Sequence, residues 1–345
     1  MKNSLLLAAM SILCSHAVAV QQTPAQVRFE QGDWELACDN TRTCRAAGYS
    51  AEEDARALSV LLTRKAGPGQ AVAVTLRLAD QGDAGRDDTK APGVSSMLAD
   101  GKPIGNVVLA GADDTGTLSA PQAAALVRAM AGTGKVEWRA GKDAWRLSGK
   151  GATAVLLKLD EFQGRLDTRG AIVRTGARGE EAVLPPLPAP VITVASLPKG
   201  KLAPPPRERE LLAALRQADT DNECQDLAAV GSDNKLSYTA LSADKMLVSA
   251  RCWRGAYNEG TGYWVARRTP PFAPVLVTAG ATDFDKGVID AAQKGRGIGD
   301  CWATGKWAWD GNAFIHTAAA TTGMCRAIAA GGAWQLPTLV STLRR

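Results

Sequence analysis

The stretch LPPLPAPVITVASLPKGKLAPPP, residues 184–206, decides how the chain is divided. It holds eight of the 17 prolines, and this composition favours extended polyproline conformations that cannot build a packed core. We therefore expect an interdomain linker at residues 184–206, between an N-terminal domain of residues 20–183 and a C-terminal domain of residues 207–345. A long loop within one domain is the alternative interpretation.

The size of the chain agrees with this division. Its 345 residues correspond to about two domains of ordinary size. The apolar share of 46% and the charged share of 22% are those of a globular protein and exclude a fibrous or disordered chain. The formal net charge of +5 is too small on this length to indicate a nucleic-acid-binding protein, so no nucleic acid partner is expected.

Residues 1–19 are typical of a secretory signal peptide. Lys2 supplies the positive charge, residues 5–13 form the apolar segment, and residues 17–19 are a small-residue cleavage site. A lipoprotein signal at Cys14 is the alternative, but that motif requires a small residue where leucine precedes the cysteine. The apolar segment is shorter than the roughly 18 to 20 residues of a membrane span, so we expect export without an anchor. The chain contains no Asn-x-Ser/Thr acceptor, which favours the bacterial periplasm.

Cleavage after Ala19 would leave six of the seven cysteines. Two of these lie near the start of the mature chain and four lie in its last part, and an oxidising compartment favours pairing between close neighbours. The predicted disulfides are Cys38 with Cys44, Cys224 with Cys252, and Cys301 with Cys325. A zinc site is the alternative, but the chain has no C-x-x-C motif and would keep one histidine, so no metal is expected.

The first segment alternates short apolar runs with turn residues, which predicts a mostly antiparallel sheet. Ser119 and Gln122 form a capping box, and Gly132 ends the helix that this box begins. Lysine and aspartate around Gly141 suggest a hairpin. The expected strands are residues 33–38, 58–64, 71–78, 106–109, 135–139, 145–147 and 154–159.

The second segment begins with an amphipathic helix after Pro206 and continues with strands. Asp310-Gly311 between aromatic-rich runs is a strong hairpin signal. The predicted fold class is α+β, mainly β, with two antiparallel β-rich domains that each carry a helix. The expected strands are residues 236–241, 246–252, 263–267, 275–278, 304–309 and 314–317.

Several stretches together resemble the exported bacterial family called domain of unknown function 1176, whose members have about this length and share six cysteines. The first half is also distantly similar to the invasion-associated locus B proteins, on the Trp-x-x-x-Cys opening. The resemblance implies export, disulfides and the full-length architecture, and it brings no activity and no cofactor. The matching stretches are residues 33–49 (DWELACDNTRTCRAAGY), 159–165 (LDEFQGR), 252–258 (CWRGAYN), 295–301 (GRGIGDC) and 309–311 (WDG).

Catalytic chemistry finds little support in the residues. His316 would be the one mature histidine, it falls on the second strand of the Asp-Gly hairpin, and no Gly-x-Ser-x-Gly occurs. Asp160 and Glu161 would point to opposite faces of a strand, which prevents them from acting as a carboxylate pair. Asp283 and Asp285 fit a solvated turn better than an active site. No catalytic residue and no cofactor are therefore expected.

Aromatic residues are the remaining clue, since six of nine tryptophans follow residue 206. Most of them should fill the core. The functional alternative is an aromatic platform for a glycan or a protein. The arginines that flank it and would recognise acidic groups are Arg251, Arg254, Arg267 and Arg268. The members of the platform are the predicted binding residues Trp253, Arg254, Tyr257, Trp307 and Trp309.

The sequence thus favours a non-catalytic binding or envelope-associated protein of the periplasm, whose partner is an unknown envelope protein or glycan. One concrete version is an inhibitor of a wall-degrading hydrolase that would use residues 254–262 as a rigid loop. An envelope glycan hydrolase with carboxylates and a structural assembly subunit are the alternatives.

The signal peptide generates a direct prediction. The intact mass of the protein recovered from a periplasmic extract should correspond to residues 20–345 with every remaining cysteine oxidised. Mass spectrometry before and after thiol alkylation measures both quantities. A mass that still includes residues 1–19, or any alkylated cysteine without prior reduction, would contradict it.

Overall fold

The computed structural model describes residues 26–79, 93–110, 115–200, 202–231 and 234–345. The predicted signal peptide lies outside these residues. These described residues form mainly antiparallel β-sheet with three α-helices, which confirms the predicted fold class. No helix of the described ranges is long and apolar enough to cross a membrane.

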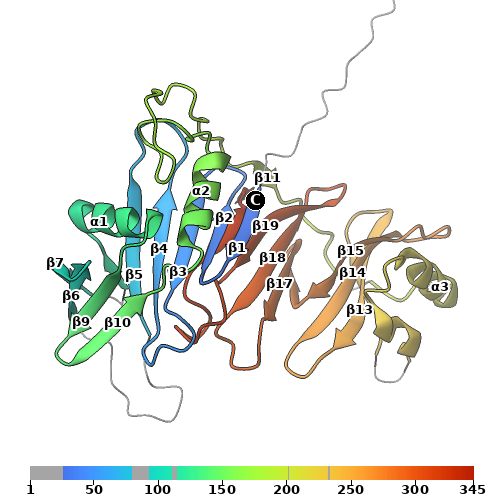
Figure 1. The fold of residues 1–345 in the computed structure, drawn as a ribbon. Coiled ribbons are helices and arrows are strands. Elements are labelled where there is room, and N and C mark those ends of the chain that lie inside the picture. The colour runs from blue at the N-terminus through green and yellow to red at the C-terminus, as the bar shows by residue number, and fades with distance from the viewer. Residues whose placement is uncertain (1–25, 80–92, 111–114, 201, 232–233) are drawn as a thin grey trace, which may run out of the picture.

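A six-stranded antiparallel sheet forms the centre of the N-terminal part (Figure 1). A second sheet of four strands lies beside it in the order β10-β9-β6-β7. The first sheet has the order β1 (Val27–Gln31), β2 (Trp34–Cys38), β3 (Cys44–Tyr49), β4 (Leu58–Arg64), β5 (Val72–Leu78), β8 (Thr115–Thr117). The second contains β6 (Val94–Ala99), β7 (Lys102–Val108), β9 (Val136–Ala140) and β10 (Asp143–Leu147).

Two helices and the second sheet cover one face of the six-stranded sheet. α1 (Ala120–Ala131) begins at the predicted Ser119–Gln122 capping box and buries Leu126 and Met130. α2 (Ala152–Phe162) buries the side chains of Val155, Leu156 and Leu159 in the same core.

The prediction of a strand at residues 154–159 was wrong, because these residues lie inside α2. Valine and the leucines of this run suit either a buried strand or a buried helix, and periodicity over so few residues does not separate the two. Gly151 with a φ of 91° turns the chain at the helix N-terminus, and the alanine-rich and leucine-rich composition then favours the helix. Asp160 and Glu161 are therefore neighbours on a helix and do not face opposite sides of a strand.

The C-terminal part contains two further antiparallel sheets. A four-stranded sheet has the order β12 (Ser237–Ala240), β13 (Lys245–Arg254), β14 (Glu259–Arg267), β15 (Val275–Ala281). A five-stranded sheet has the order β16 (Asp283–Asp285), β17 (Val288–Lys294), β18 (Trp302–Trp309), β19 (Phe314–Thr321), β20 (Leu336–Leu339). The predicted Asp310-Gly311 hairpin joins β18 to β19.

Strand β13 is buried on both faces. Met246 and Val248 pack towards α3 (Glu208–Ala218) and the short 3₁₀ helix η2 (Gln225–Ala229). Leu247, on the opposite face, packs with Ile289 and Trp309 of the five-stranded sheet. The two C-terminal sheets therefore share a core, and α3 covers the outer side of the four-stranded sheet (Figure 1).

All three predicted disulfides are confirmed, at Cys38–Cys44, Cys224–Cys252 and Cys301–Cys325. Disulfides of this number are typical of proteins that reach an oxidising compartment.

The proline-rich stretch is extended, and part of it pairs with the chain end. β11 (Val191–Thr193) forms a parallel pair with β21 (Thr342–Arg344). The backbone N–H of Ala195 donates to the carbonyl of Trp309 at 2.8 Å. The division into two domains with a linker at residues 184–206 stays a prediction.

The chain beyond β19 returns to the outer face of the six-stranded sheet. Ile328, Ala333 and Leu336 pack there against Ala47 and Tyr49. Beneath them, the Tyr49 hydroxyl donates to Glu35 Oε1 at 2.6 Å, and the Met324 N–H donates to the same oxygen at 2.7 Å. We call residues 324–340 the clamp segment, because they fix the end of the chain to the first sheet.

The buried Glu35 predicts a pH dependence of stability. Burial raises the pKa of Glu35 above its ordinary value of 4.5, although bonds from Tyr49 and Met324 oppose the shift. A carboxyl group with a raised pKa in the folded state loses stability as the pH rises from 4.5 through the folded pKa. Glu35→Gln keeps an oxygen acceptor and removes the charge, so its stability relative to wild type should increase over that pH range.

Urea unfolding at a series of pH values measures this difference. Each pKa unit of displacement corresponds to about 1.4 kcal/mol. Glu161→Gln is the matched control, because Glu161 is exposed and bound to Lys158. Parallel curves for wild type and Glu35→Gln across pH 4.5 to 8 would refute the prediction.

Candidate functional site

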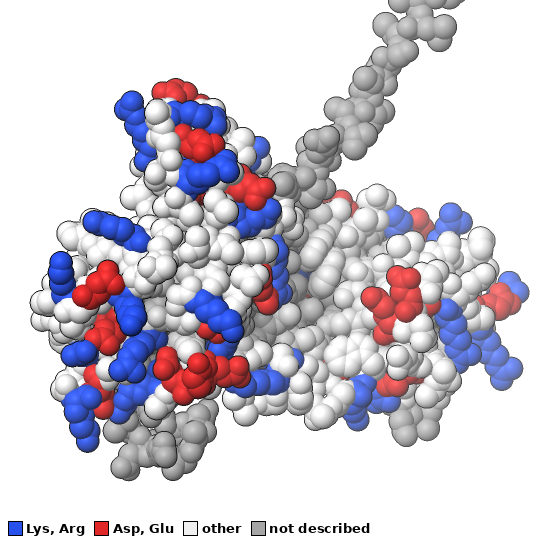
Figure 2. Space-filling model, viewed as in Figure 1, with Lys and Arg blue, Asp and Glu red and all other residues white. Residues whose placement is uncertain are grey.

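A groove opens between the ends of the four-stranded sheet and the β18–β19 hairpin. Its volume is about 500 Å³, which is within the range of ligand-binding clefts. The lining is mostly apolar and includes Val265 of β14, Val275 and Val277 of β15, and Phe314 of β19. Figure 2 shows that charged side chains crowd the N-terminal sheets, whereas the face over β15, β17 and β18 is largely uncharged.

An aromatic pair forms one wall of the groove. The hairpin register places Trp307 of β18 opposite His316 of β19. Their rings stack with centroids 4.7 Å apart and an interplanar angle of 13°. Partial burial lowers the pKa of His316, against a smaller opposing effect of a hydrogen bond to the backbone of Ala318. The imidazole is therefore neutral at pH 7 and presents a flat ring.

Two cations lie at the rim of the groove. Lys245 Nζ donates to the carbonyl and to the Oδ1 of Asn312, each at 2.8 Å, and lies 5.7 Å from the Trp309 ring. Arg267 is exposed, and its guanidinium makes no ion pair within the ranges that the structure describes. The exposed Asp244 is close enough to interact electrostatically with both cations. Arg267 is thus the cation available to an anionic ligand.

The structure places the predicted binding residues at two separate positions. Trp307 is half-buried in the groove wall, whereas Trp309 is 1% exposed and belongs to the core between the two sheets. Trp253 lies eight residues along β13 from Lys245, which corresponds to roughly 26 Å of extended strand. Trp253, Arg254 and Tyr257 are therefore not brought together with Trp307.

This second position is the turn between β13 and β14. Trp253 packs across Gly260, where an added Cβ atom would lie 2.3 Å from the indole ring. Arg254 pairs with Glu259 at 3.0 Å. The half-exposed Tyr257 donates its hydroxyl to the carbonyl of Gly295 at 3.3 Å. The turn is consequently held against the loop that precedes β18.

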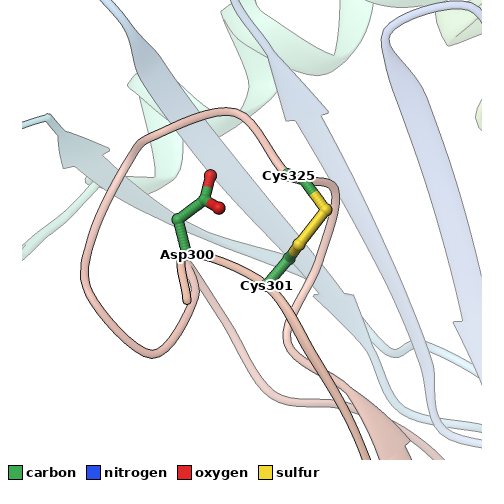
Figure 3. A group of neighbouring side chains, drawn as sticks. All are labelled: Asp300, Cys301 and Cys325. Atoms are coloured by element: carbon green, nitrogen blue, oxygen red, sulfur yellow. A yellow bond between two sulfur atoms is a disulfide. The ribbon is translucent and has the colours of Figure 1, made fainter. Parts of the chain in front are cut away.

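Asp300, Cys301 and Cys325 are metal-ligating residue types whose ligand atoms lie within 4.8 Å of one another (Figure 3). The two cysteines are bonded to each other, so neither can act as a thiolate ligand. Burial raises the pKa of Asp300, but hydrogen bonds from Arg296 and the Ala327 N–H outweigh this and lower it. We therefore assign the cluster a structural role: its disulfide joins the loop before β18 to the segment after β19.

A cluster of buried charges follows α2. Arg165 is fully buried and donates to Gln163 Oε1 at 2.9 Å, to Glu180 Oε1 at 3.0 Å and to the Gly67 carbonyl at 2.6 Å. Burial lowers the pKa of Arg165, and it lowers that of the neighbouring Arg64 to about 10.

The carboxylate of Asp160 is also hydrogen-bonded within this cluster. It accepts the N–H groups of Ile172 and Val173 at 2.6 and 3.0 Å and receives Arg64 Nη1 at 3.4 Å. Glu161, its sequence neighbour, is exposed and pairs with Lys158. Because Gln163 and Arg165 donate to the backbone carbonyls of residues 64–67 at the end of β4, we assign the cluster to the fixing of residues 163–184 onto the first sheet.

Sequence reasoning did not identify Lys245 or Val275 as site residues, and it mentioned Arg267 only as a flanking charge. The predicted hairpin contained a usable signal, because strands that end at Trp309 and resume at Phe314 place Trp307 opposite His316. Sequence spacing carries no comparable signal for Lys245 and Val275.

Comparison with known proteins identifies the family to which the chain belongs. The family model described as "Protein of unknown function (DUF1176)" matches residues 28–341, so the chain belongs to this family. It is also similar to the "Uncharacterized protein YpfG" of Escherichia coli strain K12, with 27% identity over 325 residues that cover 86% of this chain and 87% of that protein. No solved structure matches the chain. The likeness to the invasion-associated locus B proteins stays a resemblance based on the Trp34 to Cys38 opening.

The buried charge cluster generates a stability prediction. Arg165→Ala removes the partner of Glu180 and Gln163 in a buried site, and loss of one member of a buried ion pair costs about 3 to 5 kcal/mol. Arg174→Ala is the matched control, because Arg174 forms an exposed pair with Asp167. That change should cost about 0 to 1 kcal/mol.

Denaturant unfolding of both variants measures the two effects. Equal losses for Arg165→Ala and Arg174→Ala would show that the buried cluster does not stabilise the fold.

Proposed function

We propose that this protein is a non-catalytic binding protein of the bacterial periplasm, and that the groove beside Trp307 holds an anionic envelope ligand with an apolar face. The observation that carries the proposal is the combination of an apolar groove, a flat aromatic wall and, at the rim, Arg267, which forms no ion pair with any of the described residues. The disulfides and the predicted signal peptide support a location outside the cytoplasm.

The lining chemistry supports binding over catalysis. The described residues that line the groove include no Ser, Cys, Asp or Glu. His316 therefore has no nucleophile within the groove to activate, and no carboxylate pair is available there for glycoside hydrolysis. A neutral stacked imidazole and an indole instead provide a surface for a sugar ring or an apolar side chain.

The charge of the ligand follows from Arg267. The Arg267 guanidinium makes no ion pair or side-chain hydrogen bond with the residues that the structure describes, so it is suited to a carboxylate, with which it can form two parallel hydrogen bonds. Lys245 already donates to Asn312, so it adds positive potential to the rim. Its ammonium group lacks the paired N–H groups with which a guanidinium binds a carboxylate. Envelope polymers rich in carboxylates fit this requirement.

Inhibition of a wall-degrading hydrolase is the second candidate, and the turn at residues 254–259 favours it. Asn258 exchanges two hydrogen bonds with the backbone of Lys294, at 2.8 and 3.0 Å. The exposed Tyr257 and the 66% exposed Ile298 project from the two loops held in this way. Rigid exposed loops with an aromatic anchor are suited to insertion into another protein's cleft.

Binding of soluble carboxylate-rich cell-wall fragments tests the main proposal. We expect Arg267→Ala to weaken binding about tenfold, because a charged hydrogen bond is lost. Trp307→Ala should weaken it by a similar factor through the loss of the stacking surface. Titration calorimetry at two salt concentrations measures both, and higher salt should weaken wild type more than Arg267→Ala.

Arg254→Ala is the control, because Arg254 is also exposed and lies at the far end of β13. Trp309→Ala is unsuitable, since removal of a buried indole would damage the core. If neither groove variant alters the affinity while Arg254→Ala does, the groove is not the site and the turn becomes the better candidate.

A further inference from the structure

We propose that the groove binds an anionic amphiphile with a single hydrocarbon chain, such as a fatty acid or a monoacyl phospholipid. This inference rests on the proposed function of the groove and names the chemical class of its ligand. Four observations support it: the position of the groove between two sheets, the apolar side chains left open there, the cations grouped at one end, and the few hydrogen-bonding groups of the remaining lining.

The groove lies on the face of the four-stranded sheet that looks towards the five-stranded sheet. Val265 and Val277 line it, and both pack with the core between the two sheets. From the five-stranded sheet, Trp307 and Phe314 belong to the same core and line the groove as well. The groove is therefore an opening into the apolar interior between the sheets, and a hydrocarbon chain placed there would extend the packing of that interior.

Apolar side chains in the groove keep part of their surface in water. Val275 is 65% exposed, and Val265, Val277, Trp307 and Phe314 are only partly buried. The strand register places Val265 directly opposite Val275, so these two side chains form a continuous patch. A hydrocarbon chain would displace water from this patch, which is favourable in proportion to the apolar area removed from water.

Two cations are grouped at one end of the groove. Lys245 and Arg267 are direct partners on the neighbouring strands β13 and β14, and both line the groove. Like charges in opposed positions repel each other and destabilise a sheet. Asp244 offsets part of this repulsion, but its carboxylate is exposed and accepts a hydrogen bond from Ser242 at 2.6 Å. An anionic headgroup between the two cations would relieve the remaining repulsion.

Both walls change from polar to apolar in the same direction. On β14, Val265 is two residues from Arg267, which corresponds to roughly 7 Å of strand. On the hairpin, Phe314 is two residues beyond Asn312, whose backbone and side chain bind Lys245. An amphiphile therefore fits with its headgroup at the cations and its chain along the valine and the phenylalanine, towards the stacked aromatic pair.

The remaining lining favours a hydrocarbon chain over a glycan. Apart from the two cations, the described lining residues with polar side-chain atoms are Trp307, Asn312 and His316. A sugar that leaves water needs hydrogen bonds for its hydroxyl groups, whereas a hydrocarbon chain needs none. The volume of about 500 Å³ is in the lower half of the range for small-molecule clefts, which suits one chain and not two.

Titration calorimetry with octanoate, decanoate and dodecanoate, each below its micelle concentration, tests the inference. Affinity should increase about twofold to fourfold for each added CH₂ group, because more chain leaves water. Dodecyltrimethylammonium has the same chain and the opposite charge, and it should bind about tenfold more weakly than dodecanoate. Dodecyl phosphate separates the two sources: binding as tight as that of dodecanoate includes phospholipids, and weaker binding restricts the ligand to fatty acids.

Variants assign the two parts of the ligand. Arg267→Ala should weaken dodecanoate binding about tenfold and leave the gain per CH₂ group unchanged. Asp244→Asn should strengthen binding about twofold, because it removes a competing carboxylate. Val275→Ser should weaken binding about threefold by removing apolar contact. The matched controls are Arg254→Ala at the far end of β13 and Val108→Ser, since Val108 is 63% exposed on β7.

Tryptophan quenching locates the chain. Dodecanoate with bromine on its terminal carbon quenches the fluorescence of an indole that it contacts. Trp307→Phe keeps an aromatic ring and should remove most of the quenching. Trp253→Phe should leave the quenching unchanged, because Trp253 lies at the far end of β13. Quenching that persists in Trp307→Phe would place the chain outside the groove and overturn the inference.

The other outcomes separate this inference from the proposed function. Wall fragments that bind through Arg267, without binding of any amphiphile, would keep the proposed function and overturn the amphiphile. Equal affinity for octanoate and dodecanoate would keep the groove as an anion site and overturn the chain. Equal affinity for dodecanoate and dodecyltrimethylammonium would overturn the headgroup contact. Sedimentation with anionic vesicles, without dodecanoate binding, would assign the face to a membrane surface and overturn the inference. Failure of every probe would overturn both proposals.

Discussion

The structure depends on the contact between the clamp segment and the outer face of the first sheet. Strand β2 buries Trp34 and Leu36 on one face and Glu35 and Ala37 on the other, so both faces need a cover. Helices cover the first face, and the clamp segment covers the second. Its polar groups are paired across the contact: Asn40 exchanges two hydrogen bonds with Val340 at 3.0 and 2.7 Å, and Trp334 donates to Ser59 at 2.7 Å. The apolar side chains on both faces of β2 are therefore buried only when the clamp segment packs against the outer face.

This contact also positions the candidate site. The clamp segment follows β19, and Cys325 joins it to Cys301 directly before β18. The two strands that carry Trp307 and His316 are thus held at their far ends by the first sheet (Figure 1). The opposite side of the groove, β14 and β15, is held by its own core with α3. The groove is formed where these two independently fixed sheets diverge.

Local patterns predicted local structure well, and the reason is physical. The α1 capping box, the Asp-Gly hairpin and three disulfides with sequence separations of 6, 28 and 24 all depend on neighbours along the chain. α2 was misassigned because Val155, Leu156 and Leu159 are buried in either conformation. The groove was not predictable, because Lys245, Val275 and His316 meet only through packing of one sheet on another.

Two kinds of charged group in this protein show how structure and function can be told apart. Arg165 is buried, and its guanidinium N–H groups donate to Gln163, Glu180 and the Gly67 carbonyl. Its removal would therefore cost stability, and these N–H groups are not available to a ligand. Arg267 is exposed and unpaired among the described residues. It therefore contributes little to the stability of the fold, and its guanidinium can bind an anionic ligand.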